Sequence, residues 1–590
     1  MILNTSPAGT RNCYNSPKRR RTCSAADSSS LVASSSPLPG VRPRRAWRSS
    51  PLGVLGWFAI GFAALLAVPV VYVASNVFVT SGGSWTHLVQ TVLADYVRNT
   101  LWLAFGVGIG VMLVGVGTAW LVTMCSFPGS RTLEWALILP LAVPAYVMAY
   151  AYTDFLQFSG PVQTWLRELT GWRAREYWFP DIRSLGGAIT VMVFVLYPYV
   201  YLLARSAFLG QSVGVLEVGR TLGYGAWGSF ARIALPLARP AIAAGTSLAL
   251  METLADFGTV SYFAVPTFTT GIYRAWFSMG DPVAAAQLSA VLLGFVACVL
   301  LLERFTRGRA RYHNPAPRKR MPACRLRGWH AGGAFLACLA PLIIGFVLPS
   351  MILLHMTLAQ GDEQFGARFA LLARNSVSLA LVTSVLAIVL ALLMAYAARL
   401  RPSPVTLSAN RLASLGYAIP GTVIALGILV PVSRLDHAVD AFVSSAFGFS
   451  TGLLFTGGIA ALVYAYLVRF FAVALQTVEA GLTRITPSME SAARSLGCSP
   501  GRVLTRVHAP LLTGSLLTAG LMVFVDVMKE LPATFAMRPF NFDTLAVQAY
   551  NLAADERLAE AATASLAIVA VGLVPLVLLS RSIAKTRVRD

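Results

Sequence analysis

The sequence predicts an all-α polytopic membrane protein, with about twelve transmembrane helices arranged as two tandem six-helix halves. Composition is the first reason: of 590 residues, 56% are hydrophobic and only 12% are charged, whereas a soluble domain is about a quarter charged. The second reason is the recurrence of apolar runs of about 20 residues, the length that crosses about 30 Å of hydrocarbon as a helix. The third is a pattern of motifs that occurs twice along the chain.

Twelve apolar runs are long enough to span a bilayer as helices. They lie near residues 52–76, 99–124, 134–153, 185–208, 238–262, 283–305, 331–356, 374–398, 409–433, 452–478, 512–536 and 560–583.

The basic residues are distributed unevenly along a chain whose formal net charge is +22. Loops 77–98, 357–373 and 434–451 carry mixed or acidic charge. With an even number of spans, the basic clusters share one side of the membrane, and the positive-inside rule makes that side cytoplasmic. Both termini are therefore expected in the cytoplasm, and this placement argues against a nucleic-acid partner. The clusters are Lys18–Arg21, Arg42–Arg48, Arg304–Arg311, Arg318–Arg327 and Arg581–Arg589.

The motifs repeat at a nearly constant offset. Arg98-Asn99-Thr100 matches Arg374-Asn375-Ser376 at an offset of 276, and so does the run from Pro144 with the run from Pro420. This spacing predicts a duplication, with a first half at 51–305, a second half at 331–585, a basic cytoplasmic linker at 306–330 and a disordered basic tail at 1–50. Because each half has six spans, the halves should insert in the same orientation, related by an axis along the membrane normal.

A polar loop occurs between the fourth and fifth spans of each half, at 209–237 and at 479–511. The first copy reads EVGRTLGYGAWGSFARIALP and the second SAARSLGCSPGRVLTRVHAP. Each has a short helix of small residues, a glycine where a bend requires backbone freedom, and a proline on the return to the next span. One alternative is an amphipathic helix at the membrane surface, but two copies at equivalent places favour a docking loop. The residues expected to form these loops are Glu217, Arg220, Gly223, Pro236, Glu490, Ser491, Arg494, Gly497 and Pro510.

These loops resemble the EAA loop of binding-protein-dependent ABC importer permeases, which couples the permease to its ATPase. The first copy has Val218-Gly219 where the family prefers two alanines, and the second has Ser491 at the acidic position, with Glu490 one residue earlier. The stretches from Met251, from Phe268 and from Asp526 (DVMKELPATFAMRPFNFDTLAVQAY) look like the ferric-iron branch of fused permeases.

The resemblance implies two type I ABC importer permease halves in a bacterial inner membrane. It also implies three kinds of partner: two copies of an ABC ATPase subunit, a periplasmic substrate-binding protein and the lipid bilayer.

Nucleotide-binding machinery is absent from the sequence. The chain has four lysines, Lys18, Lys319, Lys529 and Lys585, and none follows the glycines of a Walker loop. We therefore expect no enzymatic activity and no bound cofactor in this chain, with ATP used by the separate subunit. The seven cysteines show no metal-ligand spacing, so no metal site is predicted.

Four acidic residues lie inside apolar runs, where ionisable groups are costly and usually functional. Glu252 and Asp256, and at an offset of 274 Asp526 and Glu530, stand four apart and are expected to share a helix face. They are candidates for lining a cation path. The alternative is that Arg98, Arg374 or Lys529 neutralises them as structural ion pairs.

Two tyrosine-rich stretches lie within the spans. One holds Tyr146, Tyr150 and Tyr152, and the other Tyr197, Tyr199 and Tyr201. Their hydroxyl oxygens are possible ligands for a hard metal ion, although packing or an interfacial belt is the ordinary role of such residues.

The resulting functional hypothesis is an ATP-driven importer permease. It would move ferric iron, delivered by a periplasmic binding protein, into the cytoplasm by alternating access. Thiamine or another small cation is the alternative cargo. A proton-coupled secondary transporter that uses the four acids as a relay is the alternative mechanism.

Overall fold

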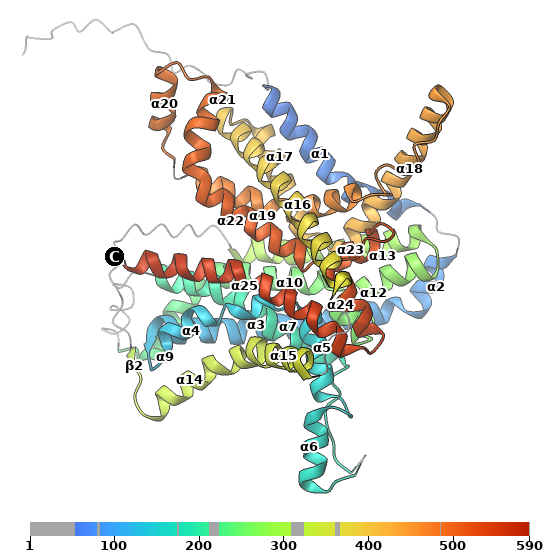
Figure 1. Ribbon diagram of the computed structural model, residues 1–590. Helices are drawn as coiled ribbons and strands as arrows, with labels where there is room; N and C mark the ends of the chain where they lie inside the picture. Colours follow the sequence, from blue (N-terminus) through green and yellow to red (C-terminus); the bar gives the residue numbers. More distant parts are fainter. Residues whose placement is uncertain are drawn as a thin grey trace, which may run out of the picture. The chain divides into compact units, whose positions relative to one another are not determined.

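The computed structural model describes residues 53–79, 83–173, 176–211, 223–307, 324–359, 366–483 and 485–588. Helices make up most of these ranges (Figure 1). The exception to the helical pattern is a short parallel pairing between β1 (Cys125–Ser126) and β2 (Cys324–Arg325), which joins the end of the linker to the end of the second span. The tail at 1–50 and most of the basic linker lie outside the described residues.

The main helices follow one another in a similar order in the two halves. The first half contains α1 (Val54–Ser75), η1 (Asn76–Phe78), α2 (Ser84–Thr91), α3 (Leu93–Met124), α4 (Ser130–Ala136), η2 (Leu139–Ala142), α5 (Ala145–Leu156), α6 (Pro161–Thr170), α7 (Leu185–Gly210), α9 (Ala226–Ser229), η3 (Phe230–Ala234), α10 (Leu235–Ala255), α11 (Gly258–Tyr262), α12 (Phe268–Tyr273), η4 (Arg274–Ser278) and α13 (Pro282–Arg307). The second half contains α14 (Trp329–Leu342), η5 (Ile343–Val347), α15 (Leu348–Ala359), α16 (Ala367–Leu400), α17 (Pro404–Ala413), η6 (Gly416–Ala418), α18 (Gly421–Phe447), α19 (Ala460–Leu482), α20 (Pro487–Ser495), α21 (Pro500–Val503), η7 (Leu504–His508), α22 (Ala509–Met528), α23 (Pro532–Met537), α24 (Leu545–Ala554) and α25 (Leu558–Val588).

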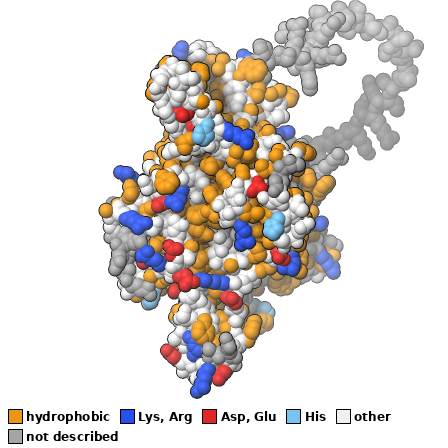
Figure 2. All heavy atoms as spheres, turned by 90° about the vertical axis from the view of Figure 1, so that its right-hand side faces the viewer, with side chains coloured by type: hydrophobic (Ala, Val, Ile, Leu, Met, Phe, Trp, Pro, Cys, Tyr) orange, Lys and Arg blue, Asp and Glu red, His pale blue; other side chains and the backbone are white. Residues whose placement is uncertain are grey.

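The all-α polytopic prediction is confirmed. Eleven helices in the described ranges are long and apolar enough to cross a membrane, or twelve if one bent pair counts as a single span. On the face shown in Figure 2, hydrophobic side chains cover much of the described surface, as expected for helices in contact with lipid.

Two expected spans, 134–153 and 409–433, are not single helices. The first bends by 92° between Ser130–Ala142 and Ala145–Thr170, and α18 begins only at Gly421, after the separate α17. The cause lies in the matched prolines Pro144 and Pro420. The residue before each, Val143 and Ile419, is extended, because a proline disfavours helical backbone in the residue that precedes it.

The spans expected at 238–262 and 512–536 are also interrupted. Helix α10 ends at Ala255 and a separate α11 begins at Gly258, whereas α22 ends at Met528 and α23 begins at Pro532. In the second half Pro532, in the first turn of α23, has no backbone N–H with which to continue the hydrogen bonds of α22. In the first half Asp256 is extended and its carboxylate caps the following turn. Each break lies beside the acidic residues singled out in the sequence.

The central helices of each half pack together, while the first span of each half packs on the other half. Helices α3, α7 and α10 lie side by side, as do α16, α19 and α22 (Figure 1). Helix α1 packs against α16, α17 and α18, and α14 and α15 pack against α3, α4 and α5. Glycines permit the closest of these approaches: a Cβ at Gly427 would lie 2.6 Å from the Pro69 oxygen, and one at Gly345 would lie 2.5 Å from the Phe194 oxygen. The halves are thus interlocked.

The repeated Arg-Asn-Thr/Ser motif fixes equivalent loops in the two halves. The Asn99 side chain donates to the backbone oxygen of Pro266 at 3.0 Å, and that of Asn375 donates to the backbone oxygen of Asp543 at 3.1 Å. Both acceptors precede a short helix, α12 or α24. The repeat therefore encodes a tertiary contact that holds the segment after each broken span.

Candidate translocation cavity and coupling loops

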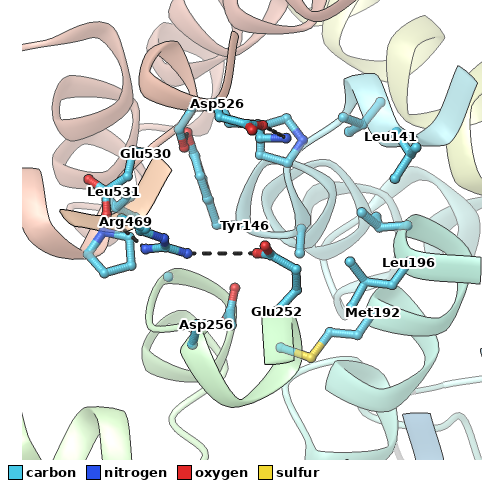
Figure 3. Close-up of a pocket in the computed structure, with 18 of the residues that line it drawn as sticks. Leu141, Tyr146, Met192, Leu196, Glu252, Asp256, Arg469, Asp526, Glu530 and Leu531 are labelled. Atoms are coloured by element: carbon cyan, nitrogen blue, oxygen red, sulfur yellow. Dashed lines mark hydrogen bonds and ion pairs between the residues drawn. The ribbon is translucent and has the colours of Figure 1, made fainter. Parts of the chain in front are cut away.

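A cavity of about 110 Å³ lies between the halves, at the breaks that follow α10 and α22 (Figure 3). Its lining includes four carboxylates and two cationic side chains, a formal charge of −2. Three tyrosines add hydroxyl groups. The polar lining residues are Tyr146, Tyr199, Glu252, Asp256, Tyr417, Arg469, Asp526, Lys529 and Glu530. The structure therefore brings together all four acids that were predicted to line a path.

Arg469, on α19, joins the two halves across this cavity. Its Nη1 lies 3.1 Å from Glu530 Oε1 in its own half, and its Nη2 lies 3.7 Å from Glu252 Oε2 in the other half. Figure 3 shows the guanidinium reaching between these two acids. The Arg469 side chain is 9% exposed and that of Glu530 1%, so the two form a buried ion pair. Removal of either partner would leave the other as an uncompensated charge in the interior.

Asp256 and Glu530 cap the short helices that follow the breaks. Asp256 accepts hydrogen bonds from the backbone N–H groups of Thr259 and Val260. Glu530 accepts from the backbone N–H groups of Ala533 and Thr534. A carboxylate at this position satisfies N–H groups that have no partner within the helix. The prediction that the paired acids share one helix face is therefore wrong, since Asp256 and Glu530 lie beyond the ends of α10 and α22.

Glu252 and Asp526 occupy the last turns of α10 and α22 and face the cavity without such a capping role. Asp526 Oδ1 pairs with Lys529 Nζ at 2.9 Å. Of the bases considered in the sequence, Lys529 alone forms an ion pair with these acids. Arg98 pairs instead with Asp95 at 2.9 Å on an exposed surface, and in the described ranges Arg374 pairs with none of the four. All four acids thus line the cavity, and Asp256 and Glu530 also cap helices, while lining of a cation path remains a prediction.

The two halves differ in the cationic side chains that line the cavity. At the offset of 274, Arg469 corresponds to Val195 and Lys529 to Ala255, and both of these apolar residues line the cavity. The two cations thus come from the second half alone. The sequence carries a signal for Arg469, which is an isolated charge in the apolar run from Ala460 to Leu475, but a comparison of the two halves does not reveal it, because its counterpart is apolar.

The tyrosines divide between cavity and packing. Tyr146 and Tyr199 line the cavity. Tyr152 donates to the backbone oxygen of Ile344 at 2.7 Å, and Tyr201 to that of Glu134 at 2.6 Å. Among the described residues no group of three or more His, Cys, Asp or Glu side chains is placed to hold a metal ion.

The glycines of the two polar loops adopt the same backbone conformation. Gly223 has a φ of +80° and Gly497 a φ of +82°, in the left-handed region that glycine enters without steric cost. A π-helical turn follows in each half, η3 and η7, and leads into α10 or α22, where Pro236 and Pro510 occupy the first turn. Proline is tolerated there because the first N–H groups of a helix have no acceptor within it. The helix expected from Glu217 to Leu222, with Arg220, lies outside the described residues.

The second loop is tied to the membrane helices through a carboxylate. Helix α20 contains Glu490, Ser491 and Arg494. Glu490 accepts from Arg494 at 2.6 Å and from Arg399 of α16 at 3.4 Å. Arg399 also donates to the backbone oxygens of Leu482 and Ile485, at the end of α19 and just beyond it. Arg399 therefore joins α20 to α16 and to the end of α19.

Comparisons with known proteins agree with this arrangement, although no family model matches the chain. The Fe(3+)-transport system permease protein FbpB 2 of Haemophilus influenzae is 25% identical over 531 residues, which cover 88% of this chain and 96% of that protein. The molybdenum transport system permease protein ModB of Escherichia coli is 30% identical over 231 residues, which cover 38% of this chain and 96% of ModB. The chain belongs to the family of binding-protein-dependent ABC importer permeases. The sulfate transport system permease protein CysW of Escherichia coli is 31% identical over 214 residues, 35% of this chain and 70% of CysW.

As a member of this family, the protein is a multi-pass permease of the inner membrane. The substrates named for its relatives differ: iron, molybdenum and sulfate.

Proposed function

We propose that this ABC permease imports ferric iron through the cavity between its halves. The observation that carries the proposal is the cavity lining, in which carboxylate and tyrosine oxygens from both halves surround a space with a formal charge of −2. Hard cations take oxygen ligands. The FbpB 2 protein, which matches nearly the full length of this chain, is named for Fe(3+), which supports the same cargo.

The pairing of the two cationic side chains in the cavity favours a cationic cargo over an oxyanion. Arg469 and Lys529 each pair with a carboxylate. An oxyanion would have to displace those carboxylates, whereas a cation is attracted by the excess negative charge. A proton relay is less well supported, because Asp256 and Glu530 accept hydrogen bonds from backbone N–H groups as helix caps.

The proposed mechanism is alternating access. Two copies of a separate ATPase close on ATP and draw the coupling loops at 209–237 and 479–511 together. The halves at 51–305 and 331–585 then rock, and the cavity opens outward to receive the ion from a periplasmic binding protein. Both termini and the linker at 306–330 lie in the cytoplasm. The chain binds no cofactor of its own.

The substrate is tested by uptake in cells that express the chain together with its ATPase and binding protein and that lack other iron importers. We expect uptake of ⁵⁵Fe³⁺ that requires this chain and is inhibited by excess Ga³⁺, a redox-inert trivalent cation of similar coordination chemistry. Excess thiamine, molybdate and sulfate should leave it unchanged. Chain-dependent uptake of labelled thiamine, molybdate or sulfate, without uptake of ⁵⁵Fe³⁺, would overturn the proposal.

A further inference from the structure

A second cavity, of about 160 Å³, lies at the C-terminal end of α11, whose first residue, Gly258, lines the central cavity. Its polar lining comes from both halves: Arg183, Ser261 and Tyr262 from the first, and Tyr550 and Glu556 from the second. Arg183 lies two residues before α7, and the opposite end of α7 leads into the first coupling loop. The second cavity is therefore at the membrane side away from the coupling loops, which the proposed function makes the outer side.

The oxygen-bearing side chains that line this outer cavity are held in two groups, one by a hydroxyl–hydroxyl hydrogen bond and one by Arg183. Ser261 Oγ and Tyr550 Oη are 2.9 Å apart and share a hydrogen bond. The Tyr262 hydroxyl is 3.4 Å from Arg183 Nη2, and Glu556 Oε1 is 3.5 Å from Arg183 Nη1. The Glu556 side chain is 75% exposed, so a cation approaching from solvent meets this carboxylate first.

A buried tyrosine lies between the two cavities. The Tyr150 ring centroid is 4.7 Å from that of Tyr262, at the outer cavity, and 5.7 Å from that of Tyr146, at the central cavity. Tyr150 is 2% exposed, and its hydroxyl has no hydrogen-bond partner in the described part of the chain. A buried polar group without a partner is unusual in a folded protein, and a hydrated cation passing between the cavities would satisfy it.

We propose that Glu556, Tyr262, Tyr550 and Ser261 form an outer receiving site for a hard, oxygen-preferring cation, from which the ion passes by Tyr150 to the central cavity. This inference rests on the proposed function for its direction of transport. Carboxylate and phenol oxygens are the donor types that a trivalent hard cation takes.

Arg183 is the positively charged partner of Glu556 in this site. Its guanidinium pairs with Glu556 and lies over the Tyr262 ring, 5.1 Å from the centroid. A cation that binds Glu556 competes with this arginine for the carboxylate. Removal of the arginine should therefore strengthen cation binding, whereas removal of the carboxylate should weaken it.

The test is a titration of the full chain in nanodiscs with Tb³⁺, a hard trivalent cation whose luminescence is sensitised by nearby tyrosine rings. Glu556→Gln keeps the rings that sensitise Tb³⁺ and should weaken the binding midpoint at least tenfold. Arg183→Gln should tighten the midpoint several-fold. Tyr262→Phe with Tyr550→Phe should weaken the midpoint, irrespective of the change in signal amplitude. Tyr464→Phe, at a tyrosine that donates to the Leu65 backbone oxygen away from both cavities, is the matched control and should leave the midpoint unchanged.

The outcomes separate this site from the central cavity. If Glu556→Gln and Arg183→Gln both leave the midpoint unchanged, or shift it in the same direction, the outer site is refuted. Tb³⁺ binding that depends only on Glu252 and Asp526 would refute it too, while leaving the proposed import through the central cavity standing. If the proposed function itself is wrong, the unmodified chain will show no ⁵⁵Fe³⁺ uptake.

Discussion

Replacing Arg469 by leucine should sharply reduce the amount of folded permease. Arg469 is the buried partner of Glu530 and reaches Glu252 in the other half. Its loss leaves an uncompensated carboxylate in the interior, which costs on the order of 3–5 kcal/mol. The measurement is the monodisperse fraction in size-exclusion chromatography of detergent-solubilised protein, together with its thermal unfolding midpoint.

A second substitution and a control make this prediction specific. Arg469→Leu combined with Glu530→Gln should recover much of the folded protein, because the neutral amide removes the stranded charge. Arg98→Leu breaks an exposed pair, which contributes about 1 kcal/mol or less, and should behave like the unmodified chain. Equal losses in the single and the double variant would show that the ion pair is not the cause.

Replacing both Gly223 and Gly497 by valine should uncouple the permease from its ATPase while it remains inserted in the membrane. Both glycines have a positive φ, and a Cβ at either would meet nothing within 4 Å. The penalty is therefore conformational, about 1–2 kcal/mol or more for each L-residue in the left-handed region. The loops should relax to another backbone path, with loss of ATPase co-purification and at least a tenfold fall in uptake.

Asparagine at the same two positions is the matched control for this variant. It adds a side chain of similar size but tolerates the left-handed region, so ATPase binding and uptake should be largely retained. If the valine variant keeps normal transport, or if the asparagine variant fails equally, the backbone bend is not what the loops require.

Spacing and hydropathy in the sequence were sufficient to predict the polytopic all-α class and the repeated elements. They also identified the four acids that meet in the cavity, because a rare charge in an apolar run is a strong signal. The bends of the two polar loops were equally readable, since a matched glycine in each copy points to a backbone requirement rather than to a side chain.

Hydropathy alone could not predict the breaks within the spans. The mean hydropathy of residues 238–262 stays apolar across Asp256, although the backbone is extended at this residue and its carboxylate caps α11. The role of Arg469 was not predictable by comparing the halves, because its counterpart Val195 gives no hint of a charge. The first span of each half packs on the other half through contacts such as that of Gly427 with Pro69. Such contacts leave no periodic pattern in the sequence.

The central claim, that a cation crosses between the halves beside Glu252 and Asp526, is tested most directly by neutralising these two acids. The measurement is ATP-dependent ⁵⁵Fe³⁺ uptake per folded transporter in the Glu252→Gln/Asp526→Asn variant, normalised to ATPase co-purification. Neither acid caps a helix, Arg469 keeps Glu530 as its partner, and the Lys529 side chain is 30% exposed. The account therefore predicts continued assembly with the ATPase and at least a tenfold fall in uptake. Normal uptake per folded transporter, with or without a fall in protein abundance, would contradict the account.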